Sequence, residues 1–234
     1  MSHKTLISGT AYEVVGGVQM IDGTKFQMGG GKTLVGGTAF DIPFASGVPL
    51  STVTPGAILY LNESGSPVPF YIAKHDYESG LNGAGRTLVV RKDYYKDGIA
   101  TYQQNEYVNS CFADETKTLI GTTAFYIYKA NIGAAGKDEQ SGFLLSLYEF
   151  GITATNAVNE GTPLPIADTL KAMTRTQWTR TVNTANMARA FYVDSTYGAG
   201  YTNVYNELGI RPAFTLPGTL RLAQNADGTY TLAA

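Results

Sequence analysis

Three stretches decide the fold expected of most of this chain: Gln177–Arg180 (QWTR), Ala190–Ser195 (AFYVDS) and Leu208–Leu216 (LGIRPAFTL). In each, large apolar residues stand beside polar ones, and turn residues separate the stretches. Short runs of this kind between turns are typical of β-strands. We therefore expect their large apolar residues to fill a core: Trp178, Phe191, Ile210, Phe214 and Leu216.

Arg211 stands directly before Pro212 in the last stretch. A guanidinium carries five N–H donors in a fixed fork, so one arginine can hold several loop carbonyls together. We expect Arg211 to be buried or half-buried and to have a structural role, as do Trp178 and Phe214.

The same stretches resemble the closing motifs of a family of uncharacterised domains in phages and gut Firmicutes. Those motifs are a tryptophan-leucine-arginine-serine-proline string, a valine-aspartate turn and a glycine-valine-arginine-proline-alanine run. Upstream, Tyr107–Phe112 (YVNSCF) and Phe143–Glu149 (FLLSLYE) resemble the helix and the phenylalanine-leucine-leucine-serine strand of that family, in the expected order. The resemblance covers roughly residues 69 to 222.

These domains look like relatives of the C-type-lectin and formylglycine-generating-enzyme fold, and of the variable proteins of diversity-generating retroelements. The resemblance therefore implies an α+β, C-type-lectin-like domain and a virion protein, although a shared fold does not carry function with it. Two departures matter. Thr179 and Thr181-Val182 stand where the family has leucine and serine-proline, which puts the loop after Trp178 in doubt. Cys111 is the single cysteine, so it cannot supply the cysteine pair of those oxidases.

The first part of the chain repeats with a period of 14 residues, because Gly-Thr pairs begin at residues 9, 23 and 37. Each copy places two apolar residues before Ser-Gly, Asp-Gly or Gly-Gly, which indicates a tight β-hairpin. Hairpins this small must bury a face against one another, the next domain or another chain. Two interpretations stay open: a meandering arm of strands, or an attachment or oligomerisation module, with a trimer favoured. The copies are Leu6–Val14, Met20–Met28 and Leu34–Ile42.

A proline-rich stretch over residues 45–69 indicates a connection and places a domain boundary near residue 48. We expect a small all-β module of three 14-residue hairpin repeats at 1–47 and the C-type-lectin-like domain at 48–234. Within the latter, Leu119–Ile127 is interpreted as a strand or a passage from helix to strand. Helices are expected from Asn105 and over Ile166–Met173, and strands over Ala57–Asn62, Pro69–Lys74, Arg86–Lys92 and Gly142–Leu147.

Tyrosine, asparagine and glycine dominate residues 183–206. A tyrosine ring offers contact area at low entropic cost, and small polar residues supply hydrogen bonds, so this composition is typical of recognition surfaces. In the alternative interpretation, the tyrosines are ordinary strand residues packed inside. The candidate ligand-binding residues are Asn183, Asn186, Tyr192, Asp194, Tyr197, Tyr201, Asn203 and Tyr205.

Several classes of function find little support. A net charge of −2 without basic clusters argues against nucleic acid as a partner. The two histidines, His3 and His75, are too few for the usual zinc sites, so no metal and no cofactor are expected, although a calcium site built from distant loops stays open. His75 is expected in an exposed loop, and Cys111 as a small buried apolar residue. The acids Glu149, Glu160, Asp168, Asp194 and Glu207 are scattered, and no catalytic residue is expected.

Neither a signal peptide nor an apolar stretch of membrane-spanning length is apparent, so we expect a protein made in the host bacterial cytoplasm, built into a virion and not bound to a membrane. Three hypotheses follow. The first is a receptor-binding protein that recognises a bacterial surface glycan or protein, with other virion proteins as partners. The second is a decoration or structural component of capsid or tail. The third, a glycan-cleaving enzyme, would need two carboxylates facing each other across a cleft.

Overall fold

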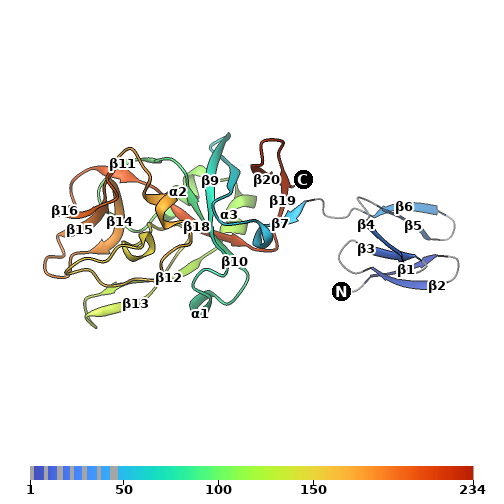
Figure 1. Ribbon diagram of the computed structural model, residues 1–234, viewed down its shortest axis with the longest axis horizontal. Coiled ribbons are helices and arrows are strands. Elements are labelled where there is room, and N and C mark those ends of the chain that lie inside the picture. Colours follow the sequence, from blue (N-terminus) through green and yellow to red (C-terminus); the bar gives the residue numbers. More distant parts are fainter. Residues whose placement is uncertain are drawn as a thin grey trace. The chain divides into compact units, whose positions relative to one another are not determined.

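The computed structural model describes residues 47–233 throughout and, before them, six strands. The chain divides into two compact units, Met1–Gly47 and Val48–Leu232, and each is described by itself (Figure 1). Over residues 47–233, strands account for 39% of the residues and helices for 16%. These proportions describe a β-rich fold with few helices.

The first unit contains three antiparallel strand pairs. Ile7 lies opposite Thr10, Ile21 opposite Thr24, and Val35 opposite Thr38. We expect these hairpins to bury one face. Their side chains lie outside the described part of the chain, so this burial stays a prediction. The pairs are β1 (His3–Ile7) with β2 (Thr10–Val14), β3 (Val18–Ile21) with β4 (Thr24–Gln27), and β5 (Gly31–Val35) with β6 (Thr38–Ile42).

The second unit is built around a seven-stranded sheet with the order β18-β10-β9-β8-β20-β19-β7. All neighbours are antiparallel except β8 and β20, which run parallel. Three strands expected from the sequence are confirmed here, because β8, β9 and β10 cover them closely. The strands are β7 (Val48–Pro49), β8 (Ile58–Glu63), β9 (Ser66–Lys74), β10 (Arg86–Arg91), β18 (Ala213–Pro217), β19 (Arg221–Gln224) and β20 (Tyr230–Leu232).

A five-stranded sheet lies toward the opposite end of this unit from β19 and β20 (Figure 1). Its order is β11-β17-β14-β15-β16, so β16 is an edge strand. Only β14 and β17 run parallel. The strands are β11 (Lys96–Gly98), β14 (Gln177–Val182), β15 (Arg189–Val193), β16 (Ala199–Asn203) and β17 (Leu208–Ile210).

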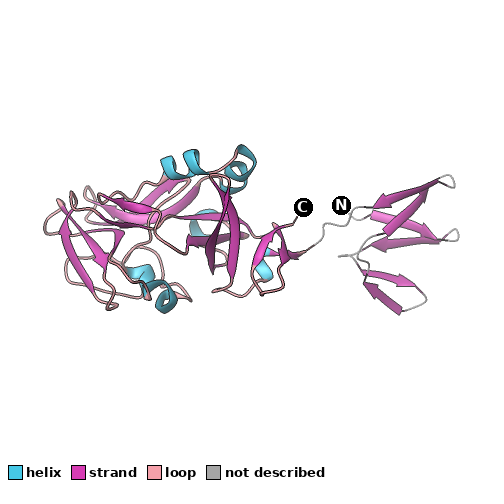
Figure 2. Cartoon of the chain, turned by 90° about the horizontal axis from the view of Figure 1, so that it is seen from above, coloured by secondary structure: helices cyan, strands magenta, loops and turns pink. Residues whose placement is uncertain are grey.

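Short helices and one further hairpin complete the second unit (Figure 2). The helices expected from Asn105 and within Ile166–Met173 are confirmed, and the passage from helix to strand over Leu119–Ile127 is confirmed as well. The helices are α1 (Ser79–Asn82), α2 (Asn105–Cys111), α3 (Asp114–Ile120), α4 (Ala167–Lys171), and the 3₁₀ turns Leu50–Thr52 and Tyr148–Phe150. The hairpin pairs β12 (Thr123–Lys129) with β13 (Ala134–Gln140).

The strand expected over Gly142–Leu147 is wrong. Only Phe143 forms bridges, to Gln103 and Ala213. Side chains take the next backbone donors, because Ser146 N donates to Glu149 Oε2 at 2.8 Å and Leu147 N to Thr181 Oγ1 at 3.0 Å. These backbone N–H groups therefore donate to side chains and not to the neighbouring strand that the apolar run had predicted.

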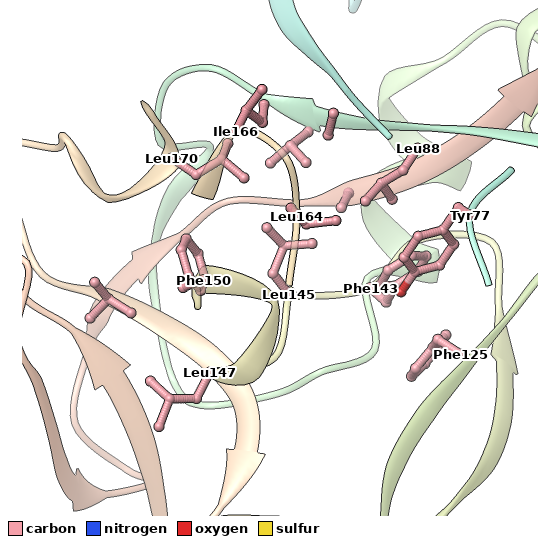
Figure 3. Packing of buried hydrophobic residues seen from close by; sticks show 14 of the residues in the cluster. Tyr77, Leu88, Phe125, Phe143, Leu145, Leu147, Phe150, Leu164, Ile166 and Leu170 are labelled. Atoms are coloured by element: carbon pink, nitrogen blue, oxygen red, sulfur yellow. The ribbon is translucent and has the colours of Figure 1, made fainter. Parts of the chain in front are cut away.

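The middle of the seven-stranded sheet is buried on both faces. Successive side chains of a strand point to opposite faces: Leu88 and Val90 join one apolar cluster, whereas Val89 joins the other. Figure 3 shows the first cluster, in which Phe143 stacks on Phe125 with ring centroids 4.6 Å apart, beside Tyr77. All core residues expected from the sequence are buried: Trp178, Phe191, Ile210, Phe214 and Leu216.

Candidate functional site

The hairpin of β15 and β16, with the turn that follows it, carries three exposed aromatic side chains. The exposed fractions are 55% for Tyr197, 46% for Tyr201 and 75% for Tyr205. Burial of an aromatic ring stabilises a folded protein. Three exposed tyrosines on one short segment therefore do not contribute the stabilisation that their burial would give. We call these three residues the tyrosine surface.

Two contacts hold Tyr201 in place on the edge strand. Its ring packs edge-on against Phe191, with centroids 5.6 Å apart. The guanidinium of Arg189 lies over the same ring, 5.6 Å from its centroid. Tyr201 therefore presents a ring whose orientation is set before any partner arrives, which lowers the entropic cost of binding.

Asp194 fixes the turn that carries Tyr197. Its Oδ1 accepts hydrogen bonds from Thr196 N at 2.8 Å, Thr196 Oγ1 at 2.6 Å and Gly198 N at 3.0 Å. The hydrogen bonds from Thr196 and Gly198 hold the pKa of the Asp194 carboxyl below its ordinary value. Tyr197 itself has a φ of +66°, a left-handed conformation that is uncommon for a bulky residue. This turn holds Tyr197 in a costly conformation with its ring exposed.

Three candidate asparagines also organise backbone turns. Asn183 is buried, and its Oδ1 accepts from Ala185 N at 3.0 Å. Asn186 Oδ1 accepts from Ala188 N at 3.1 Å, and Asn203 Oδ1 from Tyr205 N at 3.1 Å. Such Asx turns explain the abundance of these residues by local structure.

The remaining candidate, Tyr192, is half-buried. Its ring lies 6.5 Å from that of Trp178, and its hydroxyl end lies against Gly200, where an added Cβ would meet it. Five of the eight candidates thus hold turns or pack against neighbouring residues. The other three, Tyr197, Tyr201 and Tyr205, have exposed rings. The structure also brings exposed Met187 to this region, which the sequence analysis missed.

A cavity of about 220 Å³ lies near this region, between β11 and α2. Ile99 on its wall precedes Ala100, whose N–H donates to Val204 O at 2.9 Å, and Val204 N donates to Ala188 O at 3.0 Å. The cavity wall and the segment carrying Tyr205 are therefore neighbours. Tyr107, Ser110 and Ile210 were expected in a helix or in the core, but no lining residue was predicted to bind a ligand. The lining residues are Tyr95, Lys96, Asp97, Gly98, Ile99, Thr101, Gln103, Gln104, Glu106, Tyr107, Ser110 and Ile210.

Two of the scattered acids meet at a buried arginine. Arg180 Nη1 donates to Glu149 Oε2 at 2.6 Å, and Arg180 Nε lies 3.9 Å from Glu160 Oε2. All three side chains are fully buried. Burial raises the pKa of Glu160 above its ordinary value, and Arg180 partly opposes that rise. A substrate in solvent does not reach these carboxylates, so their arrangement supports the fold and not an acid–base pair in a cleft.

Trp178, Arg211 and Phe214 are buried, as expected for structural residues. Trp178 Nε1 donates to Gly98 O at 2.9 Å. Arg211 was expected to hold several loop carbonyls together. Only its Nη1 has a described partner, Leu170 O at 3.1 Å. Within the described residues, Nε and Nη2 lack hydrogen-bond partners, and burial lowers the pKa of Arg211 to about 10.

His75 lies in a loop, as expected, but the expectation that its side chain is exposed is wrong. This side chain is half-buried and bridges Thr87 Oγ1 at 2.9 Å and Val53 O at 2.7 Å, which ties two parts of the second unit together. Cys111 is buried, as expected. Over residues 47–233 and the described strands before them, no three His, Cys, Asp or Glu side chains are grouped to bind a metal ion. None of the described helices has the length and apolar character needed to cross a membrane.

Comparisons with known proteins identify a family but no function. The model of a family called domain of unknown function DUF6273 matches residues 76–218. Neither the curated proteins nor the solved structures gave a match. The matched residues are more than half of the chain and include the tyrosine surface, the cavity and Arg180. The chain therefore belongs to the DUF6273 family.

Proposed function

We propose that this protein is a recognition protein on the surface of a bacteriophage particle, and that its second unit binds a glycan or protein of the host cell surface. The observation that carries the proposal is the tyrosine surface, with its exposed rings on Tyr197, Tyr201 and Tyr205. The sequence resemblance around Trp178 and Arg211 supports the other parts of the proposal, which are a phage origin, a virion location and a C-type-lectin-like fold.

Preorganisation favours recognition over accidental exposure. Asp194 fixes the turn before Gly198, and Asn203 fixes the turn that leads to Tyr205. Tyr201 is held by Phe191 and Arg189. Rigid rings on fixed turns lose little conformational entropy on binding, and tyrosine is among the residues that contribute most to interfaces.

The first unit has a separate part in this proposal. Its three strand pairs follow the 14-residue repeat of the sequence. Two-stranded hairpins are marginal in isolation. The unit would attach the protein to other virion proteins or join copies of the chain, with a trimer as the favoured assembly.

A second candidate function is decoration or reinforcement of a capsid or tail. One observation favours it, namely that β16 is the edge of its sheet and carries Tyr201. An edge strand offers unpaired backbone groups that pair readily with another protein chain. In that case the tyrosine surface would pack against a neighbouring virion protein instead of a host receptor.

Binding of the labelled full chain to intact cells of candidate host bacteria tests the proposal. The variant Tyr197→Ala, Tyr201→Ala, Tyr205→Ala removes the tyrosine surface. The matched control is Ile132→Ala, which removes an exposed apolar side chain from the turn between β12 and β13. We expect saturable binding by the wild type and the control, and loss of binding by a triple variant that still unfolds in one cooperative transition.

Two results would contradict the proposal. Equal binding by the triple variant would remove the tyrosine surface from recognition. Absence of binding to every host, together with labelled full chain that still decorates particles in electron micrographs, would favour the structural role.

A further inference from the structure

The cavity between β11 and α2 has an apolar floor and a polar rim. Ile210, at the end of β17, and the buried Tyr107 lie among its apolar lining residues. Side chains with hydroxyl, amide and charged groups line the rest: Lys96, Thr101, Gln103, Gln104, Glu106 and Ser110. Concave sites with apolar walls and a few convergent polar groups are the usual form of small-ligand sites.

Interactions on three sides fix the walls of this cavity. Trp178 Nε1 donates to the carbonyl of Gly98 at 2.9 Å, which ties β11 to β14. Asp97 accepts two hydrogen bonds from Arg175 Nη2, at 2.6 and 2.5 Å. Gln104 Nε2 donates to Thr101 O at 3.0 Å, which closes the turn before α2. The cavity is thus a formed site that needs no large rearrangement to accept a ligand.

Some rim groups keep their hydrogen-bonding capacity for a ligand. No hydrogen bond or ion pair between described residues engages the Thr101 hydroxyl or the Glu106 carboxylate. Lys96 contacts the ring of Tyr95, with its Nζ 5.3 Å from the centroid, and has no carboxylate partner in the described part of the chain. The rim therefore offers both donors and acceptors.

The charges of the lining residues limit the class of ligand that the cavity can attract. Asp97 is neutralised by Arg175, and the remaining rim charges, Lys96 and Glu106, are of opposite sign. A site with balanced charge gives no net attraction to a phosphate or an acidic sugar. A neutral sugar fits better, because each of its hydroxyls both donates and accepts while its C–H groups pack on apolar surface.

Size limits the ligand to one ring. The volume of about 220 Å³ falls below the roughly 300–1,000 Å³ typical of sites for drug-sized ligands. We infer that this cavity binds one neutral sugar residue of a surface glycan, an inference that rests on the proposed role in host-surface recognition. Ala100 N is bonded to Val204 O, so the wall at Ile99 adjoins the segment that carries Tyr205, and we expect the rest of the glycan to extend in that direction.

Titration of the ¹⁵N-labelled full chain with neutral monosaccharides, followed by amide chemical shifts, tests this inference. The probes are glucose, galactose, mannose, rhamnose, N-acetylglucosamine and N-acetylgalactosamine, with inorganic phosphate and N-acetylneuraminic acid as charged comparisons. We expect at least one neutral sugar to shift the amides of Gly98, Thr101 and Gln103 saturably. Neither charged probe should do so.

Two variants locate the binding, and a third is the control. Thr101→Val and Glu106→Ala each remove a rim group, and each should weaken the affinity about tenfold, as loss of a hydrogen bond to a ligand does. Thr116→Val changes a residue of a neighbouring cavity of about 480 Å³ and should leave the affinity unchanged.

The outcomes separate this inference from the proposed function. No saturable shift with any neutral sugar, equal affinity in the rim variants, or tighter binding of the charged probes would each overturn the inference. Cell binding that persists in the rim variants but is lost in the tyrosine variant would also overturn it, while leaving the proposed function intact. Sugar binding without binding to host cells would support the cavity and contradict host recognition.

Discussion

Arg180 donates a hydrogen bond of 2.6 Å from Nη1 to Oε2 of Glu149, and both side chains are fully buried. Arg180 also donates from Nε to Tyr126 O at 2.8 Å and from Nη1 to Leu144 O at 2.9 Å. Glu149 accepts a further hydrogen bond from the Tyr77 hydroxyl at 2.6 Å. This pair therefore joins β14, β12 and the segment after Phe143 in the interior of the second unit.

Arg180→Met tests this pair. Removal of one partner of a buried ion pair leaves the other charge uncompensated, which costs about 3–5 kcal/mol. We expect a loss of this size in the unfolding free energy, measured by urea denaturation of the full chain. The control is Arg175→Met, because the ion pair of Arg175 with Asp97 is exposed and should contribute little. Similar losses in the two variants would contradict the assignment.

Arg211→Met is expected to behave differently from Arg180→Met. Arg211 is buried but bonded to Leu170 O alone among the described residues, so its desolvation is poorly compensated. Replacement of such a charge by an apolar side chain of similar length is often neutral or stabilising. The unfolding free energy should stay within about 1 kcal/mol of the wild type. A loss as large as that of Arg180→Met would show that Arg211 has a stabilising partner.

Glu160→Gln should change how stability depends on pH. Burial raises the pKa of Glu160 in the folded chain above 4.5, its ordinary value. The folded state therefore binds this proton more tightly than the unfolded state, and the proton stabilises the fold at low pH. As the pH rises from about 4.5 through the folded-state pKa, the wild type should lose this stabilisation, whereas the glutamine variant should not. Urea denaturation across this range measures the difference, and parallel curves would contradict the prediction.

Gly161→Ala tests the packing around the same carboxylates. Gly161 has a φ of +84°, and an added Cβ would lie 3.1 Å from Glu149 Oε1 and 3.3 Å from Glu78 Oε1. Gly65 is a matched control, because its φ is +85° and an added Cβ would meet nothing within 4 Å. Alanine at Gly65 should cost about 1–2 kcal/mol of backbone strain. Alanine at Gly161 should cost at least about 1 kcal/mol more, from crowding of the carboxylates. Equal losses in thermal or urea unfolding would contradict this packing.

Part of the candidate site was predictable from composition. The tyrosines of the Gly- and Asn-rich segment allowed two interpretations, exposed rings or rings packed inside; Tyr197, Tyr201 and Tyr205 are exposed, whereas Tyr192 is half-buried. The same reasoning grouped Asn183 and Asp194 with them as ligand-binding residues, but their side chains hold turns. Asx turns and ligand binding favour the same residue types, so composition does not separate the two roles.

The cavity was not predictable in the same way. Its lining residues come from β11, the start of α2 and the end of β17, and no motif links Lys96, Glu106 and Ile210 in the sequence. Sequence patterns report on residues two to four positions apart, which are neighbours along a strand or a helix. A cavity between elements depends on how those elements pack.

The sequence by itself determined the local structure and the inside–outside pattern of this protein. The large apolar residues Trp178, Phe191 and Phe214 were expected in the core, and all three are buried. The strands around them bury polar residues as well, such as Thr179 and Thr215. Only the tertiary structure decided the polar partners, such as Glu149 for Arg180. Apolar burial is non-directional, so a pattern of side chains is enough to predict it. A hydrogen bond or ion pair needs two specific atoms at a set distance and angle, and folding brings such atoms together from distant parts of the chain.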